Sequence, residues 1–347
     1  MTKLTILMTV YNGEAYLQEC VRSILNQTYG DFKFLILDNA STDKSREIIR
    51  SFNDPRIELA ALPENIGQTA ALNKGLDMID TPLVARMDAD DISMPLRFEQ
   101  QVKFMDTHPR IGVCGTFALI FGGKKLTRIT WPCTDEDIKV RMLFECVISH
   151  PSVMMRKSFF DKYKLRYNEK LGHSEDWELW QKASRYFELA NIPAYLLKYR
   201  LHSQNVSKST AHLQMETAKK LDTEALTLLG LEKHPLRSIH RDISLVTFNA
   251  ENKDQQFLEN VRHWFSELRT ANRLHQVYAA EALNRLLKER LFIVITKNTR
   301  LRSDVIKIFT REKLYRYVKI TWTLKFLVKI FLSLLGITIK TNENIIH

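Results

Sequence analysis

The sequence from residue 83 reads Leu83-Val84-Ala85-Arg86-Met87-Asp88-Ala89-Asp90-Asp91, an apolar run that ends abruptly in three acids. A short apolar run bounded by polar residues is typical of a buried β-strand. In extended backbone the side chains of residues i and i+2 point the same way, so Asp88 and Asp90 can face one cation. Such hard oxygen ligands suit Mg²⁺ or Mn²⁺ that bridges phosphate oxygens. A solvated turn that only caps the following helix would have the same acidic sequence. The neighbouring sequence is therefore needed to distinguish a metal site from such a turn.

Strand and helix patterns alternate around this stretch, from the N-terminus to about residue 125. Apolar residues at helical spacing separate the apolar runs, which predict strands over 5–10, 32–37, 57–62, 83–87 and 111–116. Repeated strand–helix units predict a parallel sheet covered on both faces, with ligands at the carboxyl ends of the strands. The chain has neither a Gly-x-Gly-x-x-Gly loop nor a P-loop motif, which argues against a dinucleotide site and a P-loop NTPase.

Composition and cysteine use limit the class of protein. The chain has 347 residues, 45% of them hydrophobic and 26% charged, which indicates a globular protein of more than one domain. Its four cysteines are widely spaced without a Cys-x-x-Cys pair, which argues against a zinc ribbon or a disulfide scaffold and favours an intracellular protein. The first apolar run passes directly into a polar turn, so we expect a strand there and not a signal peptide. No apolar segment has the roughly 18 residues needed to span a bilayer.

Charge and helical pattern divide the chain into two parts. The net charge is +11; residues 1–210 hold 28 basic and 26 acidic side chains, whereas residues 211–347 hold 23 and 14. Long helical patterns with few Gly or Pro residues replace the strand–helix alternation after Leu201. We therefore expect a catalytic domain over 1–210 and a basic, mainly helical region over 211–347. The positive charge favours an anionic membrane face or nucleic acid as a partner, unless it only solvates a helical tail.

Four ordered motifs resemble those of the inverting family 2 glycosyltransferases of GT-A fold. They are Thr9-Val10-Tyr11-Asn12-Gly13, Leu37-Asp38-Asn39-Ala40-Ser41-Thr42-Asp43, Glu64-Asn65-Ile66-Gly67 with the helix that follows it, and Met87-Asp88-Ala89-Asp90-Asp91. The resemblance covers roughly residues 4–205. It implies an α/β fold with a mostly parallel mixed sheet between helices, which binds a nucleotide sugar, followed by a C-terminal helical extension.

The resemblance also implies roles for the residues that match these motifs. The nucleotide sugar would be held by Thr9, Tyr11, Asn12, Asp38, Asn65 and Asp88. Asp38 would accept a hydrogen bond from a uracil N–H, and Asp90 would bind the Mn²⁺ or Mg²⁺ that neutralises the donor diphosphate, with Asp88 beside it. Two positions depart from the family. Asn39 replaces an acid, and Leu72 stands where many relatives carry an arginine that supports the nucleotide, which leaves the base preference open.

Two later blocks resemble parts of the family that complete the site. Ser174-Glu175-Asp176-Trp177 resembles the segment with the catalytic base. Ser174 can cap a helix whose first turn holds Glu175 and Asp176, and the positive end of that helix keeps a carboxylate ionised. We expect Asp176 to remove the acceptor proton, with Glu175 as the reserve. Tyr199-Arg200-Leu201-His202 resembles a block that returns to the metal or diphosphate, which makes His202 a third metal ligand.

The basic C-terminal segment has an apolar pattern of its own, for which we predict a helix over 313–339. The residues that recur at helical spacing are Tyr317, Ile320, Leu324, Leu327, Val328 and Phe331. Basic residues occupy the other half, where Phe326 and Ile330 are apolar exceptions. This pattern fits a helix that lies in the membrane interface. The alternative is a stripe that docks on the catalytic domain or on a second subunit, which would make the protein an oligomer through its C-terminal helices.

These features together predict an inverting, metal-dependent hexosyltransferase. It would move one sugar from a nucleotide sugar, with UDP favoured, to a hydroxyl of a glycan or lipid-linked glycan. The resemblance implies polysaccharide or lipopolysaccharide assembly at the cell surface, with the enzyme in the cytoplasm, peripheral on the inner face of the membrane, and without a nucleic-acid partner. Three alternatives carry less support. A sugar nucleotidyltransferase needs a Gly-rich basic loop, a processive synthase needs spanning helices, and a non-enzymatic polyanion-binding protein rests on charge alone.

Overall fold

The structure is a computed structural model that describes residues 2–171, 174–202, 211–244 and 253–334. The chain divides into two compact units, Met1–Ile138 with Cys146–Gln214, and Lys139–Glu145 with Met215–His347. The short segment Lys139–Glu145 thus belongs to the second unit, although both of its neighbours in the chain belong to the first.

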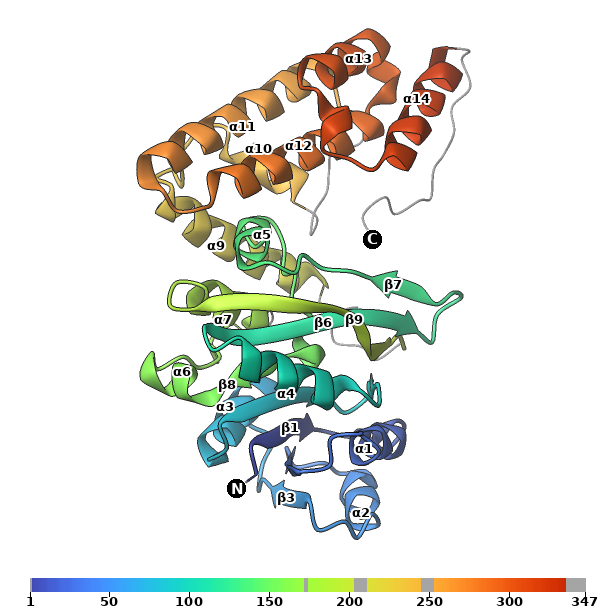
Figure 1. Cartoon of the computed structure of the whole chain (residues 1–347), viewed down its shortest axis with the longest axis vertical. Helices are drawn as coiled ribbons and strands as arrows, with labels where there is room; N and C mark the ends of the chain where they lie inside the picture. Colours follow the sequence, from blue (N-terminus) through green and yellow to red (C-terminus); the bar gives the residue numbers. More distant parts are fainter. Residues whose placement is uncertain (1, 172–173, 203–210, 245–252, 335–347) are drawn as a thin grey trace. The chain divides into compact units, whose positions relative to one another are not determined.

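The first unit is built on a mixed sheet of nine strands within the described ranges, in the order β3-β2-β1-β4-β8-β6-β9-β5, with β7 paired to β6 (Figure 1). The strands are β1 Leu4–Val10, β2 Phe32–Asp38, β3 Ile57–Ala61, β4 Leu83–Asp88, β5 Ile92–Ser93, β6 Ile111–Phe121, β7 Thr127–Ile129, β8 Met154–Arg156 and β9 Glu188–Arg200. The strands β3, β2, β1 and β4 are parallel neighbours, so their carboxyl ends meet at one edge. The predicted α/β fold class with a mixed sheet is confirmed.

Helices and one 3₁₀ turn connect these strands. They are α1 Leu17–Leu25, α2 Ser45–Arg50, α3 Gln68–Met78, α4 Arg97–Thr107, α5 Asp135–Arg141, the 3₁₀ turn η1 His150–Ser152, α6 Lys157–Lys162 and α7 Glu175–Ala183. The apolar runs of β1 and β2 are continuous because residues on both of their faces are buried. A glycine lets α3 lie close to the sheet: a Cβ atom at Gly75 would be 2.4 Å from Cδ1 of Leu7.

The second unit is helical. Its elements are α9 Ala211–Leu228, α10 Arg237–Ile243, α11 Gln255–His275, α12 Ala280–Lys297, the 3₁₀ turn η2 Thr299–Leu301, α13 Arg302–Arg311, the 3₁₀ turn η3 Leu314–Arg316 and α14 Ile320–Leu334. Asp254 caps α11, because its Oδ1 accepts a hydrogen bond from the backbone N–H of Phe257 at 2.8 Å. Trp264 of α11 and Leu287 of α12 are fully buried in the shared core.

The segment Lys139–Glu145 is held inside this helical core. Val140 and Phe144 are buried among the apolar side chains of the second unit, and Glu145 forms an ion pair with the buried Arg290. Arg290 also donates from Nη1 to the backbone oxygen of Ile243 at 3.1 Å. A buried charge is costly unless it is paired, so this pair helps to keep the segment in the helical unit.

The C-terminal helix starts later than the predicted position 313. It begins at Ile320, after the turn η3, and residues beyond 334 lie outside the described part of the chain. Among the residues of α14 whose burial is described, Phe326 and Ile330 are buried. Of the predicted apolar stripe, Tyr317 lies before the helix and is half-buried, and the other members are exposed: Ile320, Leu324, Leu327, Val328 and Phe331. No helix in the described ranges is long and apolar enough to cross a membrane.

Candidate active site

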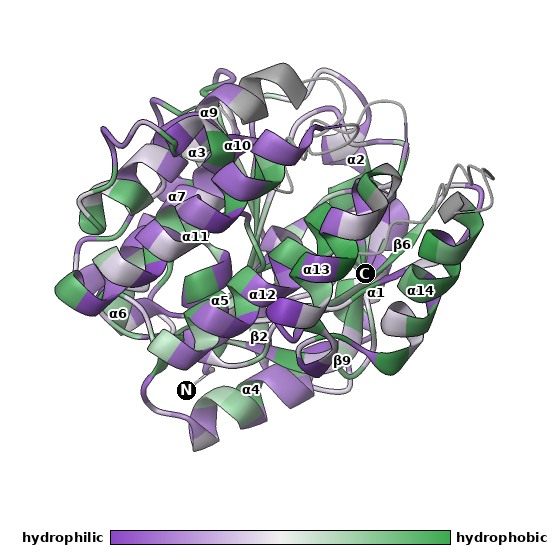
Figure 2. Ribbon diagram, turned by 90° about the horizontal axis from the view of Figure 1, so that it is seen from above, coloured by the Kyte–Doolittle hydropathy of each residue, from purple (hydrophilic) through white to green (hydrophobic). Residues whose placement is uncertain are grey.

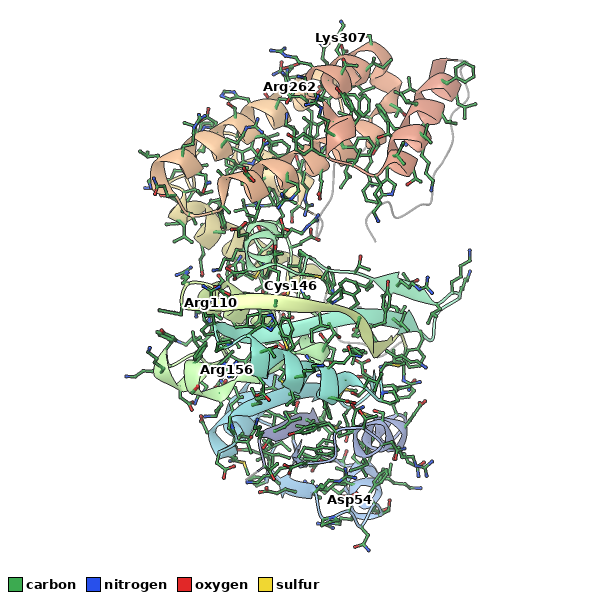
Figure 3. The ribbon with its side chains drawn as sticks, in the orientation of Figure 1. Asp54, Arg110, Cys146, Arg156, Arg262 and Lys307 are labelled. Atoms are coloured by element: carbon green, nitrogen blue, oxygen red, sulfur yellow. The ribbon has the colours of Figure 1, made fainter. Side chains whose placement is uncertain are left out.

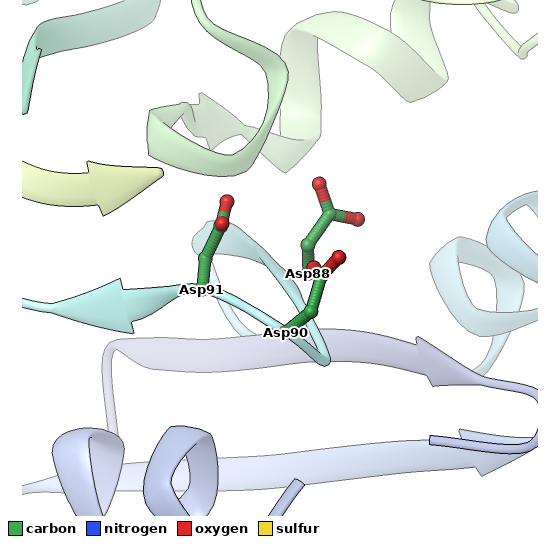
Figure 4. A group of neighbouring side chains, drawn as sticks. All are labelled: Asp88, Asp90 and Asp91. Atoms are coloured by element: carbon green, nitrogen blue, oxygen red, sulfur yellow. The ribbon is translucent and has the colours of Figure 1, made fainter. Parts of the chain in front are cut away.

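Three carboxylates gather at the carboxyl end of β4. One oxygen each of Asp88, Asp90 and Asp91 lies within 4.8 Å of the others, and the three side chains point to the same side of the turn (Figure 4). The strand ends at Asp88, and the backbone then turns through Ala89 and Asp90. The predicted convergence of Asp88 and Asp90 is therefore present, but the reason given from the sequence, extended backbone, is wrong. The turn also adds Asp91, which the sequence analysis leaves out of the metal ligands.

The end of β9 holds this acidic turn in place. The imidazole Nε2 of His202 lies 2.8 Å from Oδ2 of Asp90. Arg200 donates from its backbone N–H to Oδ1 of Asp91 at 2.8 Å and from Nε to the backbone oxygen of Asp90 at 2.7 Å. The structure thus brings together the three residues predicted to bind metal, Asp88, Asp90 and His202.

The acidic turn fits a divalent cation. Asp91 is fully buried, and its Oδ2 has no hydrogen-bond partner among the described residues. Burial raises the pKa of Asp91 well above its usual value, and repulsion from Asp88 and Asp90 adds to this. A cation among these oxygens would satisfy the orphaned atom and remove the repulsion. Carboxylate oxygens with one imidazole nearby suit Mn²⁺ or Mg²⁺.

A buried arginine, which the sequence analysis missed, lies next to this turn. Arg86 on β4 is 2% exposed and forms an ion pair with Asp88 through Nη2, while its Nε and Nη1 are buried without partners among the described residues. Burial by itself lowers the pKa of Arg86, but the charge and hydrogen bond of Asp88 together with the nearby Tyr167 and Glu175 outweigh this, and the net pKa is raised. The sequence does indicate this residue, because Arg86 is a single cation inside an otherwise apolar strand. An arginine is rarely buried unless it has a charged partner.

The two acids proposed as base and reserve open α7. Asp176 accepts hydrogen bonds from the backbone N–H of Trp177 at 2.8 Å and from the thiol of Cys146 (labelled in Figure 3) at 3.8 Å. Burial raises the pKa of Asp176, and it raises that of Glu175 to about 7, with the charge of Asp176 as the second cause. The predicted cap at Ser174 is wrong: its φ of 58° is left-handed, and its side chain makes no capping hydrogen bond.

Arg86 connects the acids of the turn electrostatically with those of α7. Burial is the main cause that raises the pKa of Asp88, and the charges of Asp90 and Asp176 add to it. The Arg86 cation acts in the opposite direction on Asp88, Glu175 and Asp176, lowering the pKa of each. Such coupling requires that these groups lie close together. The two acid groups therefore form one site around a buried cation.

Other side chains near this site are structural. The Nε2 atom of His150 lies 2.8 Å from the hydroxyl oxygen of Tyr167. Burial lowers the pKa of His150 well below its usual value, and the nearby Arg86 cation lowers it further, so the imidazole is neutral. Trp177 and Trp180 are buried, as expected for packing residues.

The residues predicted to hold the nucleotide lie at the ends of β1 and β2 and before α3. Tyr11 is 52% exposed, which leaves its ring available for stacking. Asn12 has a φ of 52°, and its Oδ1 accepts a hydrogen bond from the backbone N–H of Thr42 at 2.9 Å, so it ties two loops together. Asp38 is fully buried and forms an ion pair with Arg46 of α2.

The remaining predicted residues extend this arrangement. Thr9 lies opposite Asp88 in the register of β1 and β4. The side-chain oxygen of Asn65 accepts a hydrogen bond from Nδ2 of Asn39 at 2.9 Å. Asn39, which stands where the family has an acid, therefore holds Asn65 in position. Leu72, which stands where many relatives carry an arginine, is fully buried. The cation beside Asp38, the residue proposed to bind the nucleobase, is Arg46 of α2.

A mostly parallel sheet with a cluster of acids at the carboxyl ends of its strands is typical of the class that the motifs resemble, the nucleotide-sugar glycosyltransferases. Comparison with known proteins identifies the family. Residues 5–164 match the family described as Glycosyl transferase family 2. An uncharacterized glycosyltransferase of Haemophilus influenzae is 30% identical over 273 residues, which cover 74% of this chain and 83% of that protein. The amylovoran biosynthesis glycosyltransferase AmsE of Erwinia amylovora is 31% identical over 214 residues, 59% of this chain and 78% of AmsE. The chain belongs to glycosyltransferase family 2.

Solved structures share the fold. Residues 1–349 of TarS from S. aureus, in complex with UDP-GlcNAc, superpose with a TM-score of 0.56 at 16% identity, over 90% of this chain and 91% of that one. The mannosyltransferase PcManGT of Pyrobaculum calidifontis, in complex with GDP-Man and Mn²⁺, gives a TM-score of 0.51 at 13% identity, over 95% and 87%. At these identities the likeness concerns the fold, and it confirms the predicted GT-A-like class.

Proposed function

We propose that this glycosyltransferase moves a single hexose from a UDP-sugar to a hydroxyl of a glycan or lipid-linked glycan, with inversion, in the assembly of a cell-surface polysaccharide or lipopolysaccharide. One observation carries the proposal: the acids at the end of β4 and those at the start of α7 share the buried cation of Arg86. The acids at the end of β4 are suited to bind a metal that contacts the diphosphate, and those at the start of α7 are suited to accept a proton. The role of AmsE in amylovoran biosynthesis supports a surface polysaccharide as the product.

The nucleotide of the donor is assigned to the edge formed by β1, β2 and the loop before α3. Tyr11 offers an exposed ring for the base, and the buried carboxylate of Asp38, held by Arg46, is assigned the base N–H. Asn12 and Asn65 act by fixing the loops around the nucleotide. The UDP-GlcNAc complex of TarS supports UDP as the nucleotide.

The metal site of the proposal consists of Asp88, Asp90, Asp91 and His202. When Mn²⁺ or Mg²⁺ is bound there, it supplies positive charge against the diphosphate that leaves the sugar. The protein's own share is to hold these ligands. Arg200 fixes the backbone of the turn, and Arg86 compensates the negative charge of Asp88 through their ion pair.

The proton chemistry is assigned to Asp176. As the acceptor hydroxyl oxygen forms a bond to the anomeric carbon, its proton passes to the carboxylate of Asp176, and the bond between that carbon and the diphosphate oxygen breaks, with its electron pair leaving on the diphosphate. Attack from the face opposite the leaving group inverts the anomeric configuration. Burial opposes ionisation of Asp176, whereas the N–H of Trp177 and the cation of Arg86 favour it.

We assign this chemistry to residues 1–210 and a role in localisation to the basic helical region 211–347. The proposal places the enzyme in the cytoplasm, at the inner face of the membrane, where a lipid-linked acceptor would be presented. The acceptor site itself is assigned only to the start of α7, where the proposed base lies.

A screen of donor hydrolysis over UDP- and GDP-sugars, with and without Mn²⁺, tests the proposal. We expect one UDP-sugar to be hydrolysed in a Mn²⁺-dependent way, and Asp176→Asn to remove that activity while the variant still binds the donor. GDP-sugars belong in the screen because PcManGT binds GDP-Man. Hydrolysis of none of them, or products with retained anomeric configuration, would contradict the proposal.

A further inference from the structure

The C-terminal helix α14 has two apolar faces, of which one packs against described residues of its own unit. The first face holds Phe326 and Ile330, which are buried. The ring of Phe326 packs against Phe292 of α12 and Phe309 of α13, with centroids 5.6 and 4.9 Å apart. These contacts dock the helix on its own unit, so the second apolar face is not needed for that purpose.

The second face forms a ridge of large apolar side chains exposed along one side of the helix. The apolar ridge consists of Ile320, Leu324, Leu327, Val328 and Phe331. Their exposed fractions run from 47% at Leu327 to 76% at Ile320. The spacing of four, three, one and three residues puts them on one side of an α-helix. In Figure 2, which is coloured by hydropathy, much of α14 is in the green of hydrophobic residues. Contiguous exposed apolar side chains of this number mark an interaction surface.

The charges around the apolar ridge indicate what it meets. Residues 313–334 contain five cations, at positions 313, 316, 319, 325 and 329, and no acid. One of them, Lys329, donates from Nζ to the backbone oxygen of Thr296 at 2.7 Å, so the charge beside the ridge comes from the others. The cations at Arg316 and Lys319 lie over the rings of Tyr315 and Trp322, at 5.9 and 5.7 Å from the centroids. Amphipathic aromatic side chains and lysines or arginines of this kind gather at the level of lipid head groups.

We propose that the apolar ridge of α14 inserts into the head-group region of an anionic lipid bilayer, with the helix parallel to the surface. The helix is about 22 Å long, too short to span a bilayer, which fits a helix lying in the interface. A second copy of the chain is a poorer occupant, because two such faces would bring their cations together without any acid between them. The inference rests on the proposed function only for the lipid-linked acceptor, because binding to lipid does not require catalysis.

Co-sedimentation of the full chain with vesicles tests this inference. The probes are vesicles of phosphatidylcholine alone and of phosphatidylcholine with phosphatidylglycerol. We expect binding to the anionic vesicles, weakened by salt, and no binding to duplex DNA under the same conditions. In the triple variant Leu324→Gln, Leu327→Gln, Phe331→Gln we expect binding to fall at least about tenfold. The matched control is Leu274→Gln, which removes another exposed leucine, on α11 of the same unit, and should bind like the wild type.

Two further measurements keep the outcomes distinct. Circular dichroism and donor hydrolysis show whether the triple variant is folded, and the double variant Arg316→Gln, Lys319→Gln tests the charge without touching the apolar ridge; it should lose part of the binding to anionic vesicles. Equal binding by the triple variant and the wild type, or no binding of the wild type to anionic vesicles, overturns the inference. A wild-type dimer that becomes a monomer in the triple variant without lipid would assign the apolar ridge to a subunit interface instead. Vesicle binding without hydrolysis of any donor would leave this inference standing and contradict only the proposed function.

Discussion

The imidazole Nε2 of His202 lies 2.8 Å from Oδ2 of Asp90, although 112 residues separate the two in the chain. The contact joins the end of β9 to the turn after β4. It places His202, from the block Tyr199-Arg200-Leu201-His202, beside the acids that would bind a metal. Substitutions of either residue can therefore test the metal assignment.

The metal assignment predicts that Asp90→Ala abolishes sugar transfer. The variant loses an oxygen ligand at the turn, so the charge of the donor diphosphate is left uncompensated. Calorimetric titration with UDP, with and without Mn²⁺, should show that the Mn²⁺-dependent part of binding is lost, and EDTA should inactivate the wild type. The control is Asp80→Ala, which removes a surface acid paired with Lys33 and should behave like the wild type. Full wild-type activity in EDTA would rule out the metal.

The assignment of the base predicts a split between binding and turnover. Asp176→Asn keeps the shape of the side chain but cannot accept the proton, so kcat should fall about 10²-fold or more while the KM for the donor changes little. Steady-state kinetics with a soluble acceptor measure both. Normal turnover in Asp176→Asn together with a large loss in Glu175→Gln would show that the neighbouring acid is the base.

The pH dependence of turnover follows from the raised pKa values of the same two acids. A base works only when ionised, and burial raises the pKa of Asp176, the proposed base, above its usual value. We therefore expect kcat to rise with pH through a limb above the ordinary carboxyl range and then to level off. Glu175 has a pKa of about 7, so a limb that belonged to Glu175 would lie there. In Glu175→Gln the rising limb of kcat should remain, and its loss would assign the limb to Glu175.

The buried cation predicts a stability effect that a double-mutant cycle can isolate. Arg86→Met leaves Asp88 without its cation in a largely buried place, and we expect the free energy of unfolding to fall by about 3 kcal/mol in urea titrations. In the double variant Arg86→Met, Asp88→Asn most of this loss should be regained, because neither charge remains. Arg86→Met should also move the rising pH limb of kcat upward, since the cation lowers the pKa of both acids of α7. Additive effects on stability would mean that the pair contributes little.

The local features of this protein follow from its amino-acid sequence. The strand–helix alternation, the acids after β4 and the helical C-terminal region follow from side chains close together in the chain, and they predicted an α/β fold of GT-A type. The motifs around Asp38, Asn65 and Asp90 predicted family 2. These signals are readable because strand and helix periods and turn residues depend on neighbours within a few positions.

Contacts between residues far apart in the chain, and the burial of charges, depend on how the chain packs. The approach of His202 to Asp90, the pairing of Arg46 with Asp38, and the thiol of Cys146 at Asp176 depend on the order of strands in the sheet and on where loops return. No local period records a strand order. The isolated cation Arg86 could be read from the sequence, but its place between two groups of acids could not, because burial and partners, which set its energy, are properties of the packed chain.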